Sequence, residues 1–341
     1  MSPAHKTASG DNLLTGYLRL FRDFRRTDLV QFCDEHHRLV EQARQTRDFA
    51  EATQHYYGLM APVIETYYGE GWHFCPPEFP KQSRQDATRR LYRLVVRQLG
   101  LDHTKHGLDI GCGIGGMLRF VAKHTGAAMT GLTLGENEVE QANVAIADEG
   151  LADRCRVLQG DNCAMPIADE TFDAAYAVYS LKYHSNLDIV FQELHRVLKP
   201  KGRFAAYCLC KSKIYRREDP THARILADFE YSTAMPSLHT VDDMIESANR
   251  AGLRCVDNVD ISTGELTWYS WWVRNPLLPW LVSSPVTYGL TRFCEALRIL
   301  PRGFAIFNDT FLAGTVRSII RGGRTGVLTG SALLTFEKFD R

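Results

Sequence analysis

The chain contains one segment whose residue types and spacing could bind a ligand through the main chain. Its glycines alternate with other residues after an acid, in the order Asp109, Gly111, Gly113, Gly115. An apolar run precedes the acid and helical spacing of apolar residues follows, so we predict a strand, a tight turn and a helix over 107–122. Glycines allow positive φ and close approach of a ligand. The helix start adds unpaired N–H groups and partial positive charge, so the turn predicts a nucleotide or nucleoside site.

The glycines alone leave two kinds of ligand open. The spacing Gly111-x-Gly113-x-x-Gly116 also fits the fingerprint of dinucleotide-binding proteins. Those proteins carry an acid roughly 20 residues further on, at the end of the next strand, and the predicted strand 127–132 ends without one. With Asp109 the segment reads Asp-x-Gly-x-Gly-x-Gly, the pattern by which S-adenosylmethionine-dependent methyltransferases are recognised. The turn therefore favours a methyl donor over a dinucleotide.

Composition bounds the other classes. The 341 residues include 40 Lys plus Arg and 40 Asp plus Glu, so no net field favours a nucleic-acid partner. No apolar run reaches the ~18 residues of a spanning helix, and the polar start 1–12 does not resemble a signal peptide. Nine cysteines without framework spacing suit a reducing compartment. Cys208-x-Cys210 has the wrong spacing for zinc, so we predict no metal.

Strands and helices alternate regularly from residue 84, which predicts an α/β fold with a mostly parallel sheet. The expected strands are 107–110, 127–132, 154–159, 172–179, 202–210, 253–261 and 332–339. The expected helices are 84–99, 117–124, 136–149, 187–198 and 242–251.

The flanks of this α/β region differ in composition. Residues 13–26 predict a basic amphipathic helix, which either lies on an anionic membrane or packs on its own domain. Residues 28–55 continue as a charged helix. The stretch 56–74 mixes aromatic residues with glycines, so we expect a loop that packs a core or faces a flat apolar ligand or a sulfonium. The apolar interval 262–330 suggests a lid over a greasy substrate, with a dimer interface or extra core as alternatives.

Three later stretches agree with a methyl-donor site. They are Gly160-Asp161-Asn162 after the third strand, Phe172–Ala177 in the fourth, and Val197-Leu198-Lys199-Pro200-Lys201-Gly202 before the fifth. Together with the turn they resemble the class I methyltransferases over residues 84–210. The resemblance implies a Rossmann-like sheet with an antiparallel last strand and S-adenosylmethionine as cofactor. The cofactor-binding residues it implies are Tyr57, Asp109, Gly111, Cys112, Gly113, Gly115, Leu132, Thr133, Glu138, Asp161, Asn162 and Ala177. Within this set Glu138 is expected at the ribose, and Asp161 and Asn162 at adenine.

The resemblance narrows to the sterol C-methyltransferases over about residues 55–339. Tyr56-Tyr57, Tyr67-Tyr68-Gly69 and His73-Phe74 stand where that family carries its aromatic N-terminal block. Met235-Pro236-Ser237-Leu238-His239 and the stretch 322–329 resemble its carboxyl-terminal domain. The family implies a sterol as methyl acceptor.

The departures from the family pattern point to one branch. Enzymes that methylate carbon 24 usually carry Tyr-Ala-Ile-Glu-Ala-Thr-Cys-His after the fourth strand, whereas this chain has Tyr-Ala-Val-Tyr-Ser-Leu-Lys-Tyr over 176–183. An acidic Gly-Asp-Gly is also replaced, by Ser232-Thr233-Ala234. The tail segments 283–286, 298–304 and 307–308 more closely resemble the nematode branch that methylates sterol carbon 4.

Carbon 4 becomes a nucleophile beside a 3-ketone, once a base removes its proton. Such a site needs a base and a donor for the oxyanion. We expect Tyr179 or Tyr183 as the donor and His184 or Glu65 as the base, with Glu70 and Glu230 as weaker candidates. A single histidine or glutamate is more often structural. The alternatives are a sterol 24-C-methyltransferase acting on a side-chain alkene, a cyclopropane-forming or small-amine methyltransferase, and a non-catalytic binder.

These inferences give a five-part organisation. We expect an N-terminal helical segment at 1–55, an aromatic cap over the active site at 56–82, and a methyltransferase core at 83–261. An apolar, sterol-binding lid at 262–330 and a final strand with its tail at 331–341 complete the chain. The expected partner is a sterol and not a nucleic acid; peripheral membrane contact and homo-oligomers stay open. The expected location is the cytoplasm, with peripheral attachment to the endoplasmic reticulum as the variant.

Overall fold

The computed structural model describes residue 22 and residues 24–68, 73–262 and 265–339, with the side chains of 65–68 outside that description. The chain forms two compact units, each assembled from three stretches. The first unit takes Met1–Trp72, Ala227–Met235 and Asn275–Ser318. The second takes His73–Leu226, Pro236–Arg274 and Ile319–Arg341.

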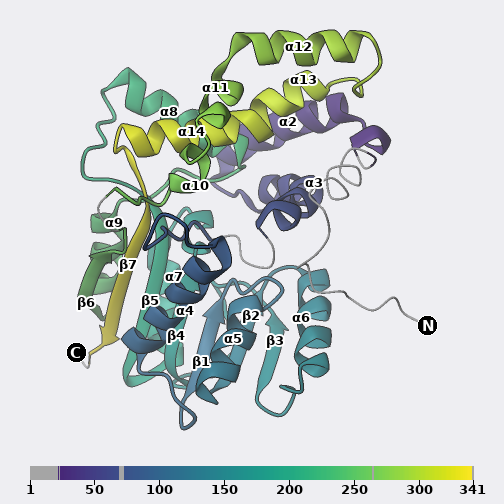
Figure 1. Ribbon diagram of the computed structural model, residues 1–341. Coiled ribbons are helices and arrows are strands. Elements are labelled where there is room, and N and C mark those ends of the chain that lie inside the picture. Colours follow the sequence, from purple (N-terminus) through teal and green to yellow (C-terminus); the bar gives the residue numbers. More distant parts are fainter. Residues whose placement is uncertain (1–21, 23, 69–72, 263–264, 340–341) are drawn as a thin grey trace. The chain divides into compact units, whose positions relative to one another are not determined.

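The second unit is built on a seven-stranded sheet in the order β3-β2-β1-β4-β5-β7-β6 (Figure 1). The strands are β1 His106–Ile110, β2 Ala128–Thr133, β3 Cys155–Gln159, β4 Phe172–Val178, β5 Leu198–Lys211, β6 Leu253–Asp260 and β7 Leu328–Lys338. The first five strands pair in parallel, and β7 pairs antiparallel with both β5 and β6. The predicted class I methyltransferase fold is thereby confirmed. β5 begins earlier than the predicted residue 202 because Leu198 already pairs with Phe172.

Helices of the second unit cover this sheet, and α4 and α5 cross its front in Figure 1. They are α4 Arg84–Leu99, α5 Gly116–Thr125, α6 Glu136–Asp148, α7 Leu187–Val197, α9 Val241–Arg250 and α10 Ser270–Val273, with the short η1 Leu181–Tyr183. Apolar residues of β4 are almost all buried, as expected for a central parallel strand. Phe191 of α7 packs against Phe204 of β5 and Phe336 of β7, so α7 and the sheet share one hydrophobic core.

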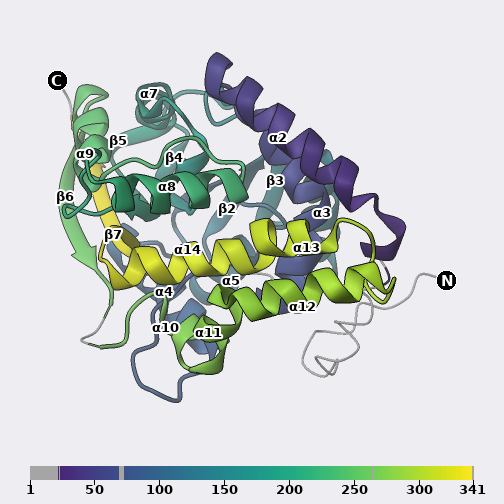
Figure 2. The ribbon, with the colours of Figure 1, turned by 90° about the horizontal axis from the view of Figure 1, so that it is seen from above.

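The first unit is helical. It contains α2 Leu29–Thr46, α3 Ala50–Tyr68, α11 Leu277–Ser283, α12 Pro285–Ala296, α13 Phe304–Phe307 and η2 Asn308–Leu312. α8 Pro220–Ser232 and α14 Ala313–Arg324 contribute residues to both units. α12 lies along α13 in both ribbon views (Figures 1 and 2). An aromatic cluster holds the unit together, in which Phe32 packs edge-on against Phe307 and Phe311.

Two expectations for the N-terminal region were wrong. The single helix over 28–55 is broken at Arg47, whose left-handed backbone (φ 64°) ends α2. The aromatic stretch is helical as far as Tyr68, although we expected a loop. Its Tyr56, Met60 and Val63 recur at helical spacing and are all buried, and this shared face outweighs the glycine and proline between them. Most of the amphipathic segment 13–26 lies outside the described residues.

Candidate functional site

The glycine turn has the backbone that its sequence predicts. Gly111, Gly113 and Gly115 have φ of 71°, 52° and 73°, a region that side chains disfavour. A Cβ on Gly111 would overlap the side chain of Ser180, which follows β4. The Gly111 and Cys112 amides donate to the Leu132 carbonyl at 2.8 and 3.0 Å, which ties the turn to the end of β2. A side chain on Gly131 would lie 2.6 Å from Cys112 Sγ, so glycine also lets β2 approach the turn.

The start of α5 is open to a ligand. No side chain caps this helix, whose N-cap is Gly115, and in the part of the chain that is described the Gly113 and Ile114 amides donate no hydrogen bond. Arg119 supports the turn from behind, donating to the Ile114 carbonyl at 2.6 Å and to Glu149 at 3.0 Å. The turn therefore presents N–H groups and a positive helix end, which fit a ligand with electronegative groups.

Glu138 is held against this turn. Thr133 Oγ1 donates to Glu138 Oε2 at 2.5 Å, so the end of β2 orients the first turn of α6. The other carboxylate oxygen lies 3.9 Å from where a Cβ of Gly113 would be. This placement brings together three of the expected cofactor residues, and a carboxylate there can accept hydrogen bonds from a ribose diol.

Asp109 is a buried acid at the end of β1. Only 4% of its surface is exposed, and burial raises its pKa to about 7, while the hydroxyl of Tyr176 lowers it. Tyr176 is its register partner on β4, so both side chains stand on the same side of the sheet. An acid this poorly solvated is stabilised as the carboxylate by a cationic ligand group. The amino group of S-adenosylmethionine is such a group, so the donor set fits that cofactor.

The residues expected at adenine stand after β3 beside His184. The Asn162 side chain lies 3.1 Å from His184 Nε2, and Asp161 accepts from the Cys163 amide at 2.9 Å. Burial lowers the pKa of His184. His184 thus contacts the predicted adenine end of the site, and its role as the base stays a prediction.

Asp161, Cys163 and His184 also place their ligand atoms within 4.8 Å of one another, which is the spacing of a metal site. Hydrogen bonding accounts for this cluster, because Cys163 Sγ lies 3.6 Å from His184 Nδ1. In the absence of a metal ion, burial raises the pKa of the Cys163 thiol to about 11, so the thiol is protonated near neutral pH. The absence of a metal stays a prediction.

Four other expected residues contribute less directly. The side chains of Leu132 and Ala177 are fully buried in the core, so their contact with a cofactor would be through the backbone. Tyr57 and Glu65 belong to α3 in the first unit, and the Glu65 side chain lies outside the described residues. Their roles stay predictions.

Tyr179 is held by its own packing. It has a left-handed φ of 60°, which is costly for a bulky residue. Its ring stacks on Tyr207 at 5.3 Å, and its hydroxyl donates to the Gly330 carbonyl of β7. Burial raises its pKa well above the ordinary value. Because a phenol has one proton, Tyr179 could donate to an oxyanion only after giving up Gly330.

Lys182 is the residue that the sequence analysis missed. Its Nζ lies 5.2 Å from the ring centre of Tyr179 and 5.0 Å from that of Tyr183. It stands in η1, two residues after Ser180, whose hydroxyl donates to the Ile110 carbonyl at 2.6 Å and which touches the glycine turn. The available signal was the family pattern, in which this position is a neutral cysteine.

The charge of Lys182 is poorly compensated. The ammonium makes no ion pair or hydrogen bond with any residue in the described ranges. Burial lowers its pKa to about 8. Desolvation, together with the charge of Lys182, lowers the pKa of half-buried His73 to about 3. A half-buried cation on two aromatic faces is stabilised mainly by cation–π attraction, which is weaker than an ion pair. Such a cation is suited to an anionic ligand group.

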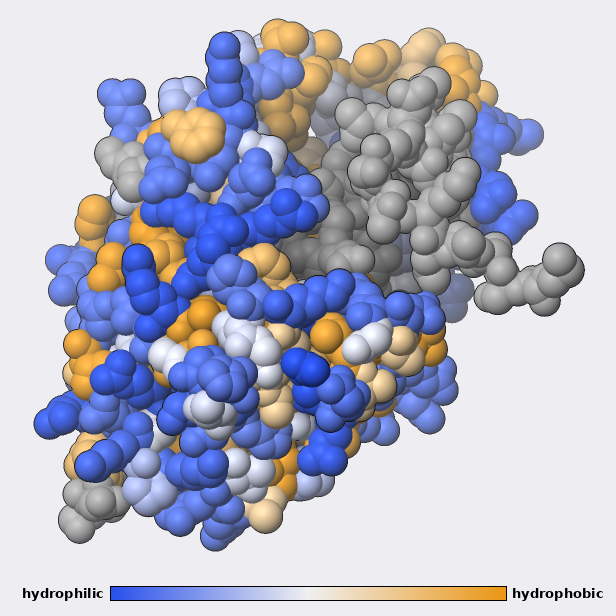
Figure 3. All heavy atoms as spheres, turned by 60° about the horizontal axis from the view of Figure 1, so that its bottom comes forward, coloured by the Kyte–Doolittle hydropathy of each residue, from blue (hydrophilic) through white to orange (hydrophobic). Residues whose placement is uncertain are grey.

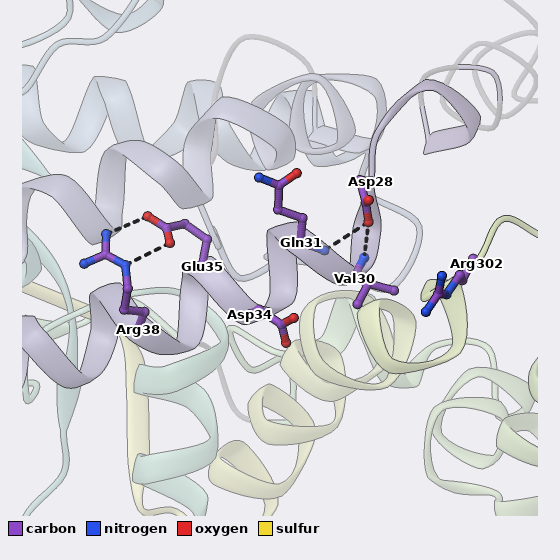
Figure 4. Close-up of a pocket in the computed structure, with 7 residues that line it drawn as sticks. All are labelled: Asp28, Val30, Gln31, Asp34, Glu35, Arg38 and Arg302. Carbon is purple, nitrogen blue, oxygen red and sulfur yellow. Dashed lines mark hydrogen bonds and ion pairs between the residues drawn. The ribbon is translucent and has the colours of Figure 1, made fainter.

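A hollow of about 480 Å³ in the first unit is of a different kind. Figure 4 shows that its lining is polar and comes mainly from α2. The Asp28 carboxylate accepts from the Val30 and Gln31 amides at 3.1 and 3.0 Å and so caps α2, and Glu35 is paired with Arg38 at 2.6 Å. These groups satisfy one another, so the hollow is explained by helix capping and surface pairing.

Comparison with known proteins agrees with this site. Residues 108–206 match the family model of a methyltransferase domain. The chain is 44% identical to the sterol 4-C-methyltransferase of Caenorhabditis elegans, over 96% of this chain and 98% of the relative. It is 30% identical to 24-methylenesterol C-methyltransferase 2 of Oryza sativa subsp. japonica, over 83% and 76%.

One solved structure shares the fold at low identity. The geranyl diphosphate C-methyltransferase of Streptomyces coelicolor, bound to S-adenosyl-L-homocysteine, aligns with a TM-score of 0.55 and 17% identity, covering 77% of this chain and 86% of that one. The methyltransferase domain and the donor-type turn make S-adenosylmethionine the cofactor of this chain. The chain therefore belongs to the sterol C-methyltransferase family, as its motifs predicted.

Proposed function

We propose that this enzyme methylates carbon 4 of a 3-keto sterol through an enolate, and that Lys182 stabilises the enolate oxygen. The 44% identity to a sterol 4-C-methyltransferase supports the position of methylation. The ketone requirement follows from chemistry, because carbon 4 is not nucleophilic beside a 3-hydroxyl group.

The observation that carries the proposal is the Lys182 ammonium, which lies over two aromatic rings and has no ion pair among the described residues. Methylation of a side-chain alkene passes through a carbocation, which a nearby ammonium destabilises and an acid stabilises. This chain has Tyr179 where the 24-C-methylating pattern has its acid, and Lys182 three residues further on. Enolate formation places negative charge on the 3-oxygen instead, and a preorganised cation in a poorly solvated site lowers the energy of that charge.

The donor end follows from the turn. Asp109 would accept from the amino group of S-adenosylmethionine, and the glycine turn would hold its methionine part. Glu138 would accept from the ribose hydroxyls, and Asn162 with Asp161 would bind adenine. When bound, this cofactor supplies an electrophilic methyl group.

The proposed reaction needs only the sterol, the methyl donor and a base of the protein. A base takes the proton from carbon 4, and the C–H electron pair becomes the enolate, whose oxygen charge Lys182 would hold. Carbon 4 then forms its bond to the methyl group as the methyl–sulfur bond breaks, with the sulfur keeping that pair. The base stays a prediction, with His184, whose Nε2 lies 3.1 Å from the Asn162 side chain, and Glu65 as the candidates.

Incubation with isotopically labelled donor and a sterol panel tests the proposal. The panel contains matched 3-keto and 3-hydroxy sterols, each with and without a side-chain alkene. We expect one labelled methyl group on carbon 4 of the 3-keto sterols and none on the 3-hydroxy sterols, located by mass spectrometry and NMR. A labelled methyl group in the side chain would assign the enzyme to carbon 24 instead.

A further inference from the structure

Helices α11 and α12 of the first unit are apolar yet bury no residue. Eight large apolar side chains of these helices and of the segment after α12 are between 44 and 69% exposed. The exposed residues are Leu277, Trp280, Leu281, Val286, Leu290, Phe293, Leu297 and Ile299. We call this set the outward stripe. Monomeric proteins rarely expose so many large apolar side chains together, so the set marks an interaction surface.

The orientation of α12 is the reverse of an ordinary amphipathic helix. Val286, Leu290, Phe293 and Leu297 are spaced four, three and four residues apart, which places them within about 60° on a helix of 100° per residue. The residues on the opposite side are half-buried, among them Glu295. Its carboxylate accepts from the Gly303 and Ala305 amides, both at 2.9 Å, which fixes the helix with its polar side inward.

The segment that carries the outward stripe has more basic than acidic residues, and one of its arginines, Arg302, lines the hollow beside Asp28, Asp34 and Glu35. Between residues 275 and 304 the chain has three arginines, Arg292, Arg298 and Arg302, and all three are exposed. The one acid in that range is Glu295, whose carboxylate is committed to amides. An anionic surface complements this arrangement, whereas a second copy would bring like charges together.

We propose that the outward stripe docks on an anionic lipid bilayer. Apolar side chains enter the acyl region while arginines meet the headgroups, as in interfacial helices. Trp280 suits the headgroup level, where indole rings gather. This inference deepens the proposed function, since a sterol is held in membranes. On the face shown in Figure 3 hydrophilic residues predominate, and apolar residues are scattered except along its upper edge, where they gather.

The outward stripe is a different surface from the basic segment 13–26, for which the sequence leaves membrane binding open. Most of that segment lies outside the described residues. Among the residues that the structure describes, no helix is long and apolar enough to cross a membrane. Docking through α11 and α12 needs no such helix.

Flotation of the full chain with lipid vesicles tests the proposal. Phosphatidylcholine vesicles with and without phosphatidylserine are the two surfaces. We expect the triple variant Val286→Ser, Leu290→Ser, Phe293→Ser to lose vesicle binding by roughly tenfold or more. The matched control is Val144→Ser with Val256→Ser, which changes side chains that are 58 and 44% exposed in the second unit and should bind as wild type.

A charge variant separates the two contributions. Arg292→Gln with Arg298→Gln should weaken binding to anionic vesicles and leave the weak binding to neutral vesicles unchanged. Circular dichroism checks the fold of each variant. Vesicle binding that the triple variant retains, or wild-type protein that stays unbound, overturns the proposal; so does a wild-type dimer that the triple variant dissociates, measured by light scattering. Vesicle binding is measured without the methylation reaction, so its outcome does not depend on which sterol carbon the enzyme methylates.

Discussion

Asp109 and Lys182 stand near the carboxyl ends of adjacent strands, and burial shifts their pKa values in opposite directions. That of Asp109 rises to about 7, and that of Lys182 falls to about 8. Asp109 belongs to a site where glycine backbone, Thr133 and Glu138 are already arranged by hydrogen bonds. Lys182 lies over the rings of Tyr179 and Tyr183 and has no ion pair or hydrogen bond among the described residues. The donor end is thus preorganised to bind the cationic amino group of the methyl donor. The acceptor end contains a cation of its own, Lys182, whose anionic partner is proposed to be the enolate oxygen of the substrate.

The largest effect should come from removing the charge at the acceptor end. Lys182→Met keeps an unbranched side chain that is one atom shorter and loses the ammonium, and we expect turnover of a 3-keto sterol to fall by about 10²–10³-fold. Donor affinity, measured by calorimetry, should be unchanged. Lys182→Arg is the matched variant. Wild-type turnover should fall as pH rises through about 8, and this loss should be absent in the arginine variant because guanidinium stays charged.

Removing the charge at the donor end should increase the stability of the cofactor-free protein. The pKa of Asp109 is raised in the folded state, so the folded protein binds this proton more tightly and loses stability as pH rises from 3.8 to about 7. Asp109→Asn should therefore make the free protein more stable at pH 8, by about 2 kcal/mol. Urea unfolding measures this. A variant less stable than wild type at pH 8 would show that the carboxylate is already compensated without the cofactor.

The affinity for the methyl donor should also depend on the ionisation of Asp109. A protonated Asp109 cannot pair with the donor's amino group, so affinity should weaken as pH falls below about 7. Between pH 8 and pH 6 we expect a loss of roughly tenfold, measured by calorimetry. Asp109→Asn should bind weakly at both pH values. An equal affinity of the wild-type protein at pH 8 and 6 would separate Asp109 from the donor.

The smallest effect is expected at Tyr179. Tyr179→Phe removes the hydrogen bond to Gly330 but keeps the stacking on Tyr207, so the unfolding free energy should fall by about 1 kcal/mol. Turnover should change little if Lys182 is the oxyanion group. A loss of turnover near that of Lys182→Met, with the fold intact, would return the oxyanion role to Tyr179.

The donor end could be predicted from the sequence because its chemistry is carried by backbone conformation. The sequence itself shows the glycines at positions that need positive φ and the acid at the end of a strand. The acceptor end could not be predicted in this way. Tyr179 has a left-handed backbone, and its hydroxyl donates to the carbonyl of Gly330 in β7, a residue 151 positions away in the sequence. Lys182 belongs to the stretch 176–183 that departs from the family pattern, but its position over two aromatic rings depends on the fold and cannot be predicted from the sequence. The helix over 56–68 was missed for the same reason.

A steroid with a phenolic A ring tests the central claim most directly, because its phenolate resembles the enolate in shape and charge. Ultraviolet absorption of the bound ligand reports its ionisation, and titration gives its affinity. We predict that wild-type enzyme with S-adenosyl-L-homocysteine binds the phenolate near pH 7 and that Lys182→Met binds only the neutral phenol, more weakly. Equal affinity and a neutral spectrum in both proteins would contradict the account.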